Sequence, residues 1–165
     1  MRNVIAFLNM KGGVCKTSLC KEIGLYLAEE CEKKVLIIDV DPQANCTQSF
    51  LERYNIFNSE LINKELKLPS IQKIFSPGVG RLDDPRIEEI ILKLSDNLHI
   101  VPGELRTIFM ERETAGGAAE QRLYNFIDEH NIKRDYDYIL VDCPPTYSFY
   151  TITALLASDL YLIPV

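Results

Sequence analysis

Two lysines, two glycines and a threonine lie close together near the start of the chain, as Lys11, Gly12, Gly13, Lys16 and Thr17. Lysine ammonium groups and the backbone N–H groups of a glycine-rich loop bind phosphate, and a threonine hydroxyl is a ligand for Mg²⁺. An apolar run precedes this segment, and residues with helical periodicity follow it. The order predicts a strand, a loop and a helix whose N-terminus faces the phosphates of a bound nucleoside triphosphate.

The loop departs from the general P-loop pattern, because Met10 and Cys15 occupy its two glycine positions. It resembles instead the deviant Walker A motif, Lys-Gly-Gly-x-Gly-Lys-Thr/Ser, of the ParA/MinD family of partition and positioning ATPases. Only Cys15 differs from that motif. The resemblance implies a P-loop NTPase fold and ATP as the nucleotide. The residues that it places around ATP are Lys11, Gly12, Gly13, Val14, Cys15, Lys16, Thr17 and Ser18.

The two lysines have separate expected roles. Lys16 directly precedes Thr17 at the start of the predicted helix, and we expect it to contact the β- and γ-phosphates within its own chain. By resemblance, Lys11 reaches across an ATP-dependent homodimer and stabilises charge on the partner's phosphates during hydrolysis. The alternative is that Lys11 is an ordinary solvated loop lysine.

An acidic segment, residues 39–45, follows the second apolar run and has the sequence Asp-Val-Asp-Pro-Gln-Ala-Asn. It resembles the Asp-x-Asp-Pro-Gln-(Gly/Ala)-Asn switch segment of the same family and favours its partition branch. By that match, Asp41 positions the attacking water and is catalytic, while Asp39 helps to organise the magnesium shell. The alternative is that an Asp-Pro turn simply ends a strand.

A third motif, residues 139–145, is an apolar run that ends in Asp142 and is followed by Cys-Pro-Pro. An acid after a buried strand is the Walker B pattern, and the Asp-x-Pro-Pro ending resembles the family again. We expect Asp142 to hold Mg²⁺, opposite the hydroxyl of Thr17. The three motifs together imply ATP and Mg²⁺ as cofactors.

Cys15 is the position that sets this loop apart from the family. A glycine there permits backbone dihedral angles that a side chain disfavours, and it leaves room beside the phosphates. We expect the cysteine to cost about 1–3 kcal/mol in backbone strain. Since about 1.4 kcal/mol corresponds to a tenfold change in affinity, ATP binding weakens by up to roughly a hundredfold.

Five apolar runs predict buried strands that position these motifs, at residues 4–8, 35–40, 98–101, 138–141 and 160–165. Continuous apolar strands are typical of a parallel sheet covered by helices on both faces. Three stripes at helical spacing predict the covering helices: Leu19, Ile23, Tyr26 and Leu27; Ile87, Ile90, Ile91 and Leu94; and Leu123, Phe126 and Ile127. This alternation predicts an α/β fold with a doubly wound, mostly parallel sheet.

The chain length of 165 residues predicts a single P-loop domain over residues 1–165. Within it, residues 47–95 are expected to be a variable insertion of short helices and loops. The last predicted strand lies at the very end of the chain, whereas family members continue further. We therefore expect the C-terminal part of the domain to be missing.

Composition limits the classes of partner. Eighteen basic and 24 acidic residues give a net charge of −6, so the surface as a whole repels nucleic acid.

Five cysteines without a C-x-x-C pair, and only two histidines, predict neither a zinc site nor disulfides, and most of the cysteines are expected to be buried. No apolar run approaches the ~20 residues of a membrane span, and no signal peptide is evident. A cytoplasmic protein without a membrane partner is expected.

The leading hypothesis from the resemblance is a ParA-like ATPase that partitions plasmid or chromosomal DNA with slow hydrolysis. The ATP-bound dimer would bind DNA non-specifically through the missing C-terminal part and associate with the nucleoid, and a centromere-binding ParB-like protein would stimulate hydrolysis. Two alternatives remain open. One is a nucleotide-binding pseudo-ATPase or regulatory module weakened by Cys15. The other is a P-loop small-molecule ligase.

Overall fold

The computed structural model describes residues 2–56, 68–75, 86–104 and 117–165. These residues form a six-stranded sheet with the order β3-β4-β2-β5-β1-β6, in which only the β3–β4 pair is antiparallel. The strands are β1 Val4–Phe7, β2 Val35–Asp39, β3 Leu92–Lys93, β4 Leu98–Val101, β5 Tyr138–Asp142 and β6 Leu160–Leu162. All five predicted strands are confirmed, and β3 is an addition to them.

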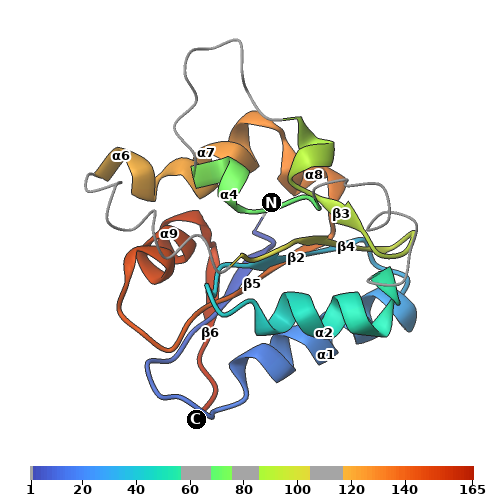
Figure 1. Cartoon of the computed structure of the whole chain (residues 1–165), viewed down its shortest axis with the longest axis horizontal. Coiled ribbons are helices and arrows are strands. Elements are labelled where there is room, and N and C mark those ends of the chain that lie inside the picture. The colour runs from blue at the N-terminus through green and yellow to red at the C-terminus, as the bar shows by residue number, and fades with distance from the viewer. Residues whose placement is uncertain (1, 57–67, 76–85, 105–116) are drawn as a thin grey trace.

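Helices cover both faces of the sheet (Figure 1). One face carries α1 (Lys16–Glu29) and α2 (Asn45–Arg53). The other face carries α4 (Gln72–Phe75), α7 (Arg122–Glu129), α8 (Ile132–Asp135) and α9 (Phe149–Ala157), with α6 (Gly117–Glu120) packed against α7 and α9. The predicted doubly wound α/β fold is therefore confirmed. None of the described helices is long and apolar enough to cross a membrane.

Strand β2 shows why its sequence is continuously apolar. Val35 and Ile37 pack into the core beneath α1 and α2, whereas Leu36 and Ile38 pack into the core on the opposite face. All four side chains are fully buried. A strand between two helical layers has no solvent-facing side, so polar residues are absent from it until its carboxyl end at Asp39.

The prediction of a helix over residues 87–94 is wrong. Only a single 3₁₀ turn, η2 (Ile87–Glu89), forms, and β3 follows it. In β3, Leu92 is buried and Lys93 is exposed, and the strand pairs antiparallel with β4 through Leu92 and Ile100. The apolar spacing in this segment fits a short edge strand as well as a helix, and the adjacent β4 selected the strand.

The first predicted helix is confirmed as α1, but its predicted buried face is partly wrong. Leu19 and Tyr26 are 36% and 62% exposed, while Ile23 and Leu27 are only partly buried. A Cβ atom added to Gly24 would lie 2.6 Å from Cδ1 of Ile37, so the glycine allows α1 to approach the sheet closely. The non-charged residues that α1 buries are Cys20, Gly24, Leu25 and Ala28. The third predicted stripe is fully buried on α7, as expected.

Residues 47–95 are described only in part, since residues 57–67 and 76–85 lie outside the described ranges. Helix α2 contributes Phe50 and Leu51 to the same core as α1. Helix α4 contributes Phe75 to the core of the opposite face, where its ring lies 5.3 Å from that of Phe149. The described parts of the segment therefore belong to both packed layers of the domain.

The cysteines follow their expected behaviour. All five are free thiols. Cys20, Cys46 and Cys143 are buried, Cys31 is partly buried and Cys15 is exposed. The prediction that most of the cysteines are buried is thus confirmed for three of the five.

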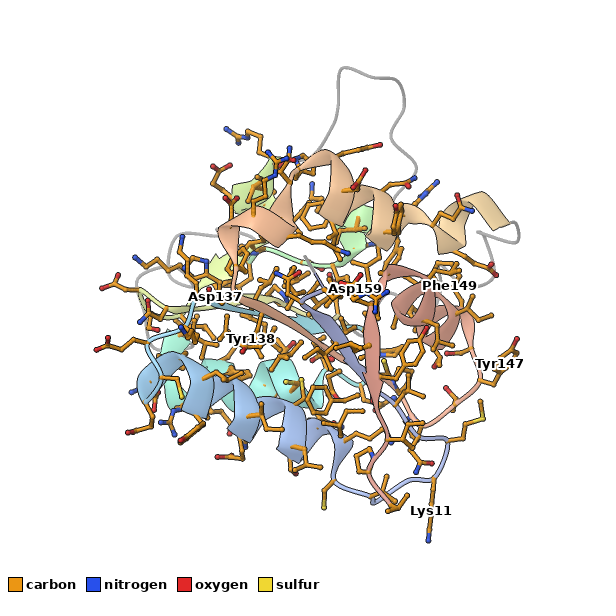
Figure 2. All side chains as sticks on the ribbon, turned by 180° about the vertical axis from the view of Figure 1, so that it is seen from behind. Lys11, Asp137, Tyr138, Tyr147, Phe149 and Asp159 are labelled. Atoms are coloured by element: carbon orange, nitrogen blue, oxygen red, sulfur yellow. The ribbon has the colours of Figure 1, made fainter. Side chains whose placement is uncertain are left out.

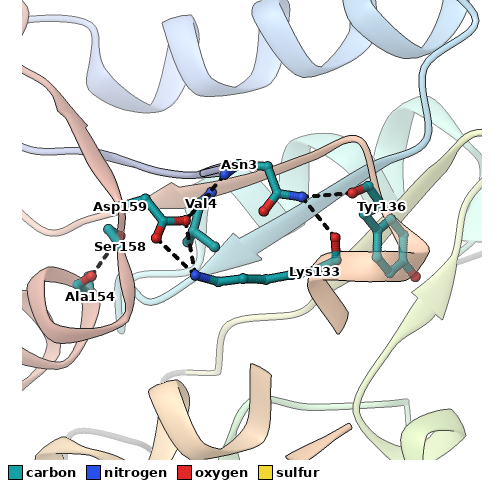
Figure 3. A network of polar contacts seen from close by, with 7 residues as sticks. All are labelled: Asn3, Val4, Lys133, Tyr136, Ala154, Ser158 and Asp159. Atoms are coloured by element: carbon teal, nitrogen blue, oxygen red, sulfur yellow. Dashed lines mark hydrogen bonds and ion pairs between the residues drawn. The ribbon is translucent and has the colours of Figure 1, made fainter. Parts of the chain in front are cut away.

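A polar network holds together the start of β1, helix α8 and the turn before β6 (Figure 3). The carboxylate of Asp159 accepts hydrogen bonds from the backbone N–H groups of Asn3 and Val4, at 3.2 and 3.1 Å. It also pairs with the ammonium of Lys133, at 2.9 Å. The side-chain amide of Asn3 donates to the backbone oxygen of Tyr136, at 2.8 Å. The network lies at the amino ends of the strands.

Asp159 is expected to stabilise the fold at neutral pH and to lose that contribution in acid. Partial burial opposes ionisation, but hydrogen bonds from Lys133 and Val4 and the charge of Lys133 outweigh it, so the pKa of Asp159 is lowered. A carboxyl group with a lowered folded-state pKa stabilises the fold above its unfolded pKa and loses that effect as the pH falls. We expect Asp159→Asn to lower the free energy of unfolding by about 1–3 kcal/mol at pH 7, and the difference to shrink below pH ~4.

Urea unfolding at a series of pH values measures this difference. Asp96→Asn is the matched control, because Asp96 also pairs with a lysine, Lys93, but is almost fully exposed. An equal loss of stability in both variants at pH 7 would contradict the role given to Asp159.

Candidate functional site

The carboxyl ends of three adjacent parallel strands meet at one edge of the sheet. In the strand register, Asp142 at the end of β5 pairs with Phe7 at the end of β1 on one side and with Asp39 at the end of β2 on the other. The loop that follows β1, the acidic segment after β2 and Asp142 are therefore brought together. Open α/β sheets bind their ligands at this edge, so the structure places the three predicted motifs where one ligand can reach them.

The loop before α1 has the backbone of an anion-binding loop. Gly13 and Cys15 both adopt left-handed conformations, with φ values of 75° and 61°. Cys15 occupies the N-cap position of α1 and makes no side-chain capping bond. The N–H groups of the first helical turn consequently remain available to an anion, whose charge the helix N-terminus favours.

Cys15 adopts the conformation for which the family motif has a glycine. Its φ of 61° and ψ of 25° lie in the left-handed region, where a non-glycine residue is strained by about 1–2 kcal/mol. Its side chain is exposed. By contrast, Gly12 has no positive φ and a Cβ atom there would meet nothing within 4 Å. The geometric need for glycine in this loop therefore lies at Gly13 and Cys15.

Asn9, which the sequence did not single out, braces the loop. Its side-chain oxygen accepts the backbone N–H of Lys11, at 2.8 Å, and its side-chain nitrogen donates to the backbone oxygen of Pro164, also at 2.8 Å. The two bonds connect the loop to the segment after β6, which pairs with β1. Nothing in the local pattern of the sequence identifies this contact, because it joins residues from opposite ends of the chain.

The two lysines point in different directions. Lys16 is only 6% exposed, and its ammonium lies 3.3 Å from the backbone oxygen of Lys11, within the loop. Lys11 is exposed, and Figure 2 shows its side chain extending away from the body of the molecule. The ammonium of Lys16 thus lies within the loop of its own chain, whereas the side chain of Lys11 extends outward.

Asp142 is fully buried, and neither of its carboxylate oxygens has a hydrogen-bond partner among the described residues. Burial, followed by the charge of Asp39, raises the pKa of Asp142 to about 7. Thr17, which lies nearby without making a hydrogen bond to it, and Lys16 act in the opposite direction. A buried carboxylate without donors is costly, and a cation would relieve that cost.

Asp39 is also fully buried, but its carboxylate is occupied. One oxygen accepts the backbone N–H and the hydroxyl of Thr47, at 2.8 and 2.7 Å, and the other accepts the backbone N–H of Asp41, at 3.2 Å. Burial raises the pKa of Asp39 to about 6, although the hydrogen bonds from Thr47 oppose the shift. Asp39 and Asp142 are therefore two neighbouring buried carboxylates with different environments.

Asp41 begins a tight turn. Its carboxylate accepts the N–H of Gln43, at 2.9 Å, and its backbone oxygen accepts the N–H of Ala44, at 2.8 Å. Ala44 is left-handed, with a φ of 53°, and directly precedes α2. The segment is thus a strand end, a turn and a helix start, and this backbone holds the Asp41 side chain at the same sheet edge as the loop.

These residues fit Mg²⁺ bound together with phosphate. Thr17 and Asp142 lie close together, and the unpartnered oxygens of Asp142 are hard ligands of the type that Mg²⁺ prefers. Within the ranges that the structure describes, no group of three or more histidine, cysteine or acidic residues can hold a metal by itself. Magnesium commonly keeps waters and phosphate oxygens as ligands, so a site with few protein ligands is compatible with the ion.

Comparison with known proteins identifies a family for this chain. A sequence model of the family described as AAA domain matches residues 2–165. The sporulation initiation inhibitor protein Soj of Bacillus subtilis is 33% identical over 168 residues, which cover 100% of this chain and 58% of Soj. The chain therefore spans a little over half the length of this curated relative.

Solved structures of at least two other proteins carry the same architecture. A putative plasmid partition protein from Borrelia burgdorferi, bound to AMPPNP, has a TM-score of 0.71 and 26% identity, and the match covers 98% of this chain and 62% of that protein. Cobyrinic acid a,c-diamide synthase from Mycobacterium smegmatis, with bound ADP and magnesium, has a TM-score of 0.78 and 25% identity, over 100% of this chain and 60% of the synthase.

Proposed function

This chain belongs to the AAA-domain family, among its ParA-like members, and on that premise we propose that it is a ParA-like ATPase for the partitioning of plasmid or chromosomal DNA. One observation carries the ATPase part of the proposal, and the likeness to the plasmid partition protein supports the partitioning part. A loop with two left-handed residues, the buried ammonium of Lys16 and the unpartnered carboxylate of Asp142 converge at one sheet edge. Together they supply the N–H donors, the cation and the metal-facing oxygens that a nucleoside triphosphate with Mg²⁺ requires.

We assign the phosphates to the loop and the first turn of α1. The backbone N–H groups of this segment bind them, and Lys16 contacts the β- and γ-phosphates. The residues concerned are Gly12, Gly13, Val14, Cys15, Lys16, Thr17 and Ser18. The nucleotides bound by the partition protein and the synthase support ATP as the ligand of this chain.

The acidic residues have two further roles, which are metal binding and orientation of the attacking water. Thr17 and Asp142 would hold Mg²⁺, and Asp39 organises the same corner of the site. Magnesium, when bound, neutralises charge that develops on the phosphates. Asp41, held by the turn after β2, orients the attacking water. Nothing else is demanded of the protein, since phosphoryl transfer depends on positioning and charge stabilisation.

Partition further requires partners. The exposed position of Lys11 supports an ATP-dependent homodimer in which Lys11 acts across the interface. We propose that a ParB-like centromere-binding protein stimulates slow hydrolysis, and that DNA contacts lie outside these residues, whose net charge is −6. The protein would then be cytoplasmic and associate with the nucleoid when ATP is bound.

The likeness to the cobyrinic acid synthase supports a second candidate, an ATP-dependent ligase for a small molecule. Such an enzyme also needs Lys16, Thr17 and Asp142, so those residues do not distinguish the two functions. Lys11 does, because an outward-directed lysine serves a dimer and is not needed within a ligase site. Turnover that depends on protein concentration favours the switch, and turnover independent of it favours the ligase.

Asp142→Asn tests the metal-facing role. Because burial raises the folded-state pKa of Asp142 to about 7, the metal-free chain loses stability as the pH rises from about 4 to about 7. The asparagine carries no charge, so we expect it to raise the melting temperature in EDTA at pH 8. With Mg²⁺ and ATP the advantage of the variant should shrink, because ligand at 100 Kd adds about 2.7 kcal/mol to the wild type only.

Thermal melts in EDTA, in Mg²⁺ and in Mg²⁺-ATP at pH 8 measure both effects. Asp128→Asn, on the exposed side of α7, is the control and should change neither. A variant that gains as much from Mg²⁺-ATP as the wild type would show that Asp142 does not face the metal.

A further inference from the structure

Thr47, in the first turn of α2, connects three parts of the site edge. Its backbone N–H and its hydroxyl both donate to the same carboxylate oxygen of Asp39, at 2.8 and 2.7 Å. The hydroxyl oxygen in turn accepts the backbone N–H of Gly103, at 2.8 Å. The Thr47 side chain is buried, so these bonds are shielded from water. One hydroxyl therefore ties the end of β2, the start of α2 and the turn after β4 together.

The carboxylate of Asp39 closes the segment between residues 41 and 47. One oxygen accepts the N–H of Asp41 at the beginning of the segment, and the other binds Thr47 at its end. The turn at Asp41 lies between these two points. The position of the Asp41 carboxylate consequently depends on an Asp39 side chain that Thr47 holds in one orientation.

Gly103 completes the arrangement by close approach. A Cβ atom at Gly103 would lie 3.0 Å from both Cγ and the backbone oxygen of Asp39. Strands β4 and β2 are neighbours in register, with Val101 opposite Ile38, so the turn after β4 packs directly against Asp39. A side chain at this position would displace Asp39 by a few tenths of an ångström, whereas glycine leaves Asp39 in place and keeps its own N–H within reach of Thr47.

We propose that Thr47 is a positioning residue for ATP hydrolysis, acting through Asp39 to place Asp41, with Gly103 as its second support. The inference rests on the proposed ATPase function. It gives different roles to Asp39 and Asp142, which the sequence alone places together at the magnesium site. Asp142, whose oxygens have no partner among the described residues, faces the metal, whereas Asp39, whose oxygens are occupied, holds the switch segment.

Three variants of the whole 165-residue chain separate positioning from stability. Thr47→Val keeps the shape but removes the hydroxyl, so Gly103 loses its acceptor and Asp39 loses one donor. Thr47→Ser restores the hydroxyl. Thr153→Val is the matched control, because Thr153 is equally buried and its hydroxyl has no partner among the described residues.

Single-turnover hydrolysis and calorimetric Mg²⁺-ATP binding are the two activity readouts. We expect Thr47→Val to lower the hydrolysis rate by about 10- to 100-fold while Kd changes by less than about threefold. Thr47→Ser and Thr153→Val should both stay near the wild-type rate. Normal hydrolysis by Thr47→Val, or equal losses of binding and rate, would overturn the proposal.

Amide hydrogen exchange tests the same contacts without relying on turnover. In nucleotide-free protein, Thr47→Val should speed exchange at Gly103 and Asp41, while Thr153→Val should not. Unchanged exchange at both amides would overturn the inference whether or not the chain hydrolyses ATP. Altered exchange in a chain that neither binds nor hydrolyses ATP, even as Cys15→Gly, would instead refute the proposed ATPase function and with it the role of Thr47 in hydrolysis.

Discussion

Replacing Lys11 by alanine is expected to lower ATP hydrolysis by about 10³-fold, because a positive group supplied to the phosphates from a partner contributes 10³ to 10⁵ in rate. The structure gives Lys11 no role in its own site that the variant would destroy. Its side chain extends outward, and the loop contacts at this residue use its backbone N–H and oxygen. Binding of Mg²⁺-ATP by the monomer should therefore change by less than about threefold.

Mixing two inactive variants shows whether Lys11 acts across a dimer. Lys11→Ala lacks the outward lysine, and Asp41→Ala lacks the carboxylate that orients water. In a mixed dimer, the site with intact Asp41 receives Lys11 from its neighbour. Random pairing makes half of the dimers mixed, each with one complete site, so we expect recovery of about a quarter of the wild-type rate.

The recovered rate must depend on protein concentration and on ATP. If Lys11 acted within its own chain, no mixture would contain a complete site and the rate would stay at background. Lys11→Ala with full activity would identify Lys11 as a solvated loop residue and would favour the ligase candidate, whose site needs no partner.

Replacing Cys15 by glycine is expected to tighten Mg²⁺-ATP binding by up to about tenfold. Cys15 is held at a φ of 61° immediately before α1, where the phosphates are expected to bind. A sulfur beside the ligand, and the part of the ~1–2 kcal/mol of backbone strain that rises on binding, oppose the tight loop. Each ~1.4 kcal/mol corresponds to a factor of ten in affinity.

Part of this strain exists before any ligand binds, because the left-handed conformation is already present in the structure. Cys15→Gly should therefore also raise the free energy of unfolding, by up to about 1 kcal/mol once the greater freedom of glycine in the unfolded chain is deducted. Calorimetry and urea unfolding on the same samples separate the two effects. A gain in the free energy of unfolding without a gain in affinity would show that Cys15 destabilises the fold and does not weaken Mg²⁺-ATP binding.

Cys15→Ala is the matched control for the sulfur. It keeps the Cβ atom and the strained dihedral angle but removes the thiol. Affinity that rises in both variants identifies the sulfur as the obstacle, and affinity that rises only with glycine identifies the backbone. If glycine restores tight binding without hydrolysis, the chain is a nucleotide-binding pseudo-ATPase, and the loss of turnover has a cause other than Cys15.

The alternation of buried strands and helices was readable from the sequence because both faces of the sheet are covered. Strands such as β2 have no polar face, and their apolar runs stand out against the loops. The short edge strand β3 was not readable. Its two residues carry too little pattern, and only the neighbouring β4 decided between strand and helix.

The buried side of α1 was misjudged for a related reason. Hydrophobicity predicts that Leu19 and Tyr26 are buried. In the structure, the face of α1 that carries small residues packs against the sheet instead, with Gly24 against Ile37. How closely a helix packs against a sheet depends on the size of the side chains between them, and a pattern of apolar residues does not predict it.

The sequence by itself determined which chemistry is available: a glycine-rich loop with two lysines, and acids at the ends of two apolar strands. Local order was sufficient there, because the carboxyl ends of parallel strands share one edge wherever those strands lie in the sheet. Only the tertiary structure decided how the acids differ. Asp39 is held by Thr47 against Gly103, and Asp142 is left without a donor among the described residues. The contact between Thr47 and Gly103 joins residues that are 56 positions apart in the sequence, and its geometry exists only once the strands have paired.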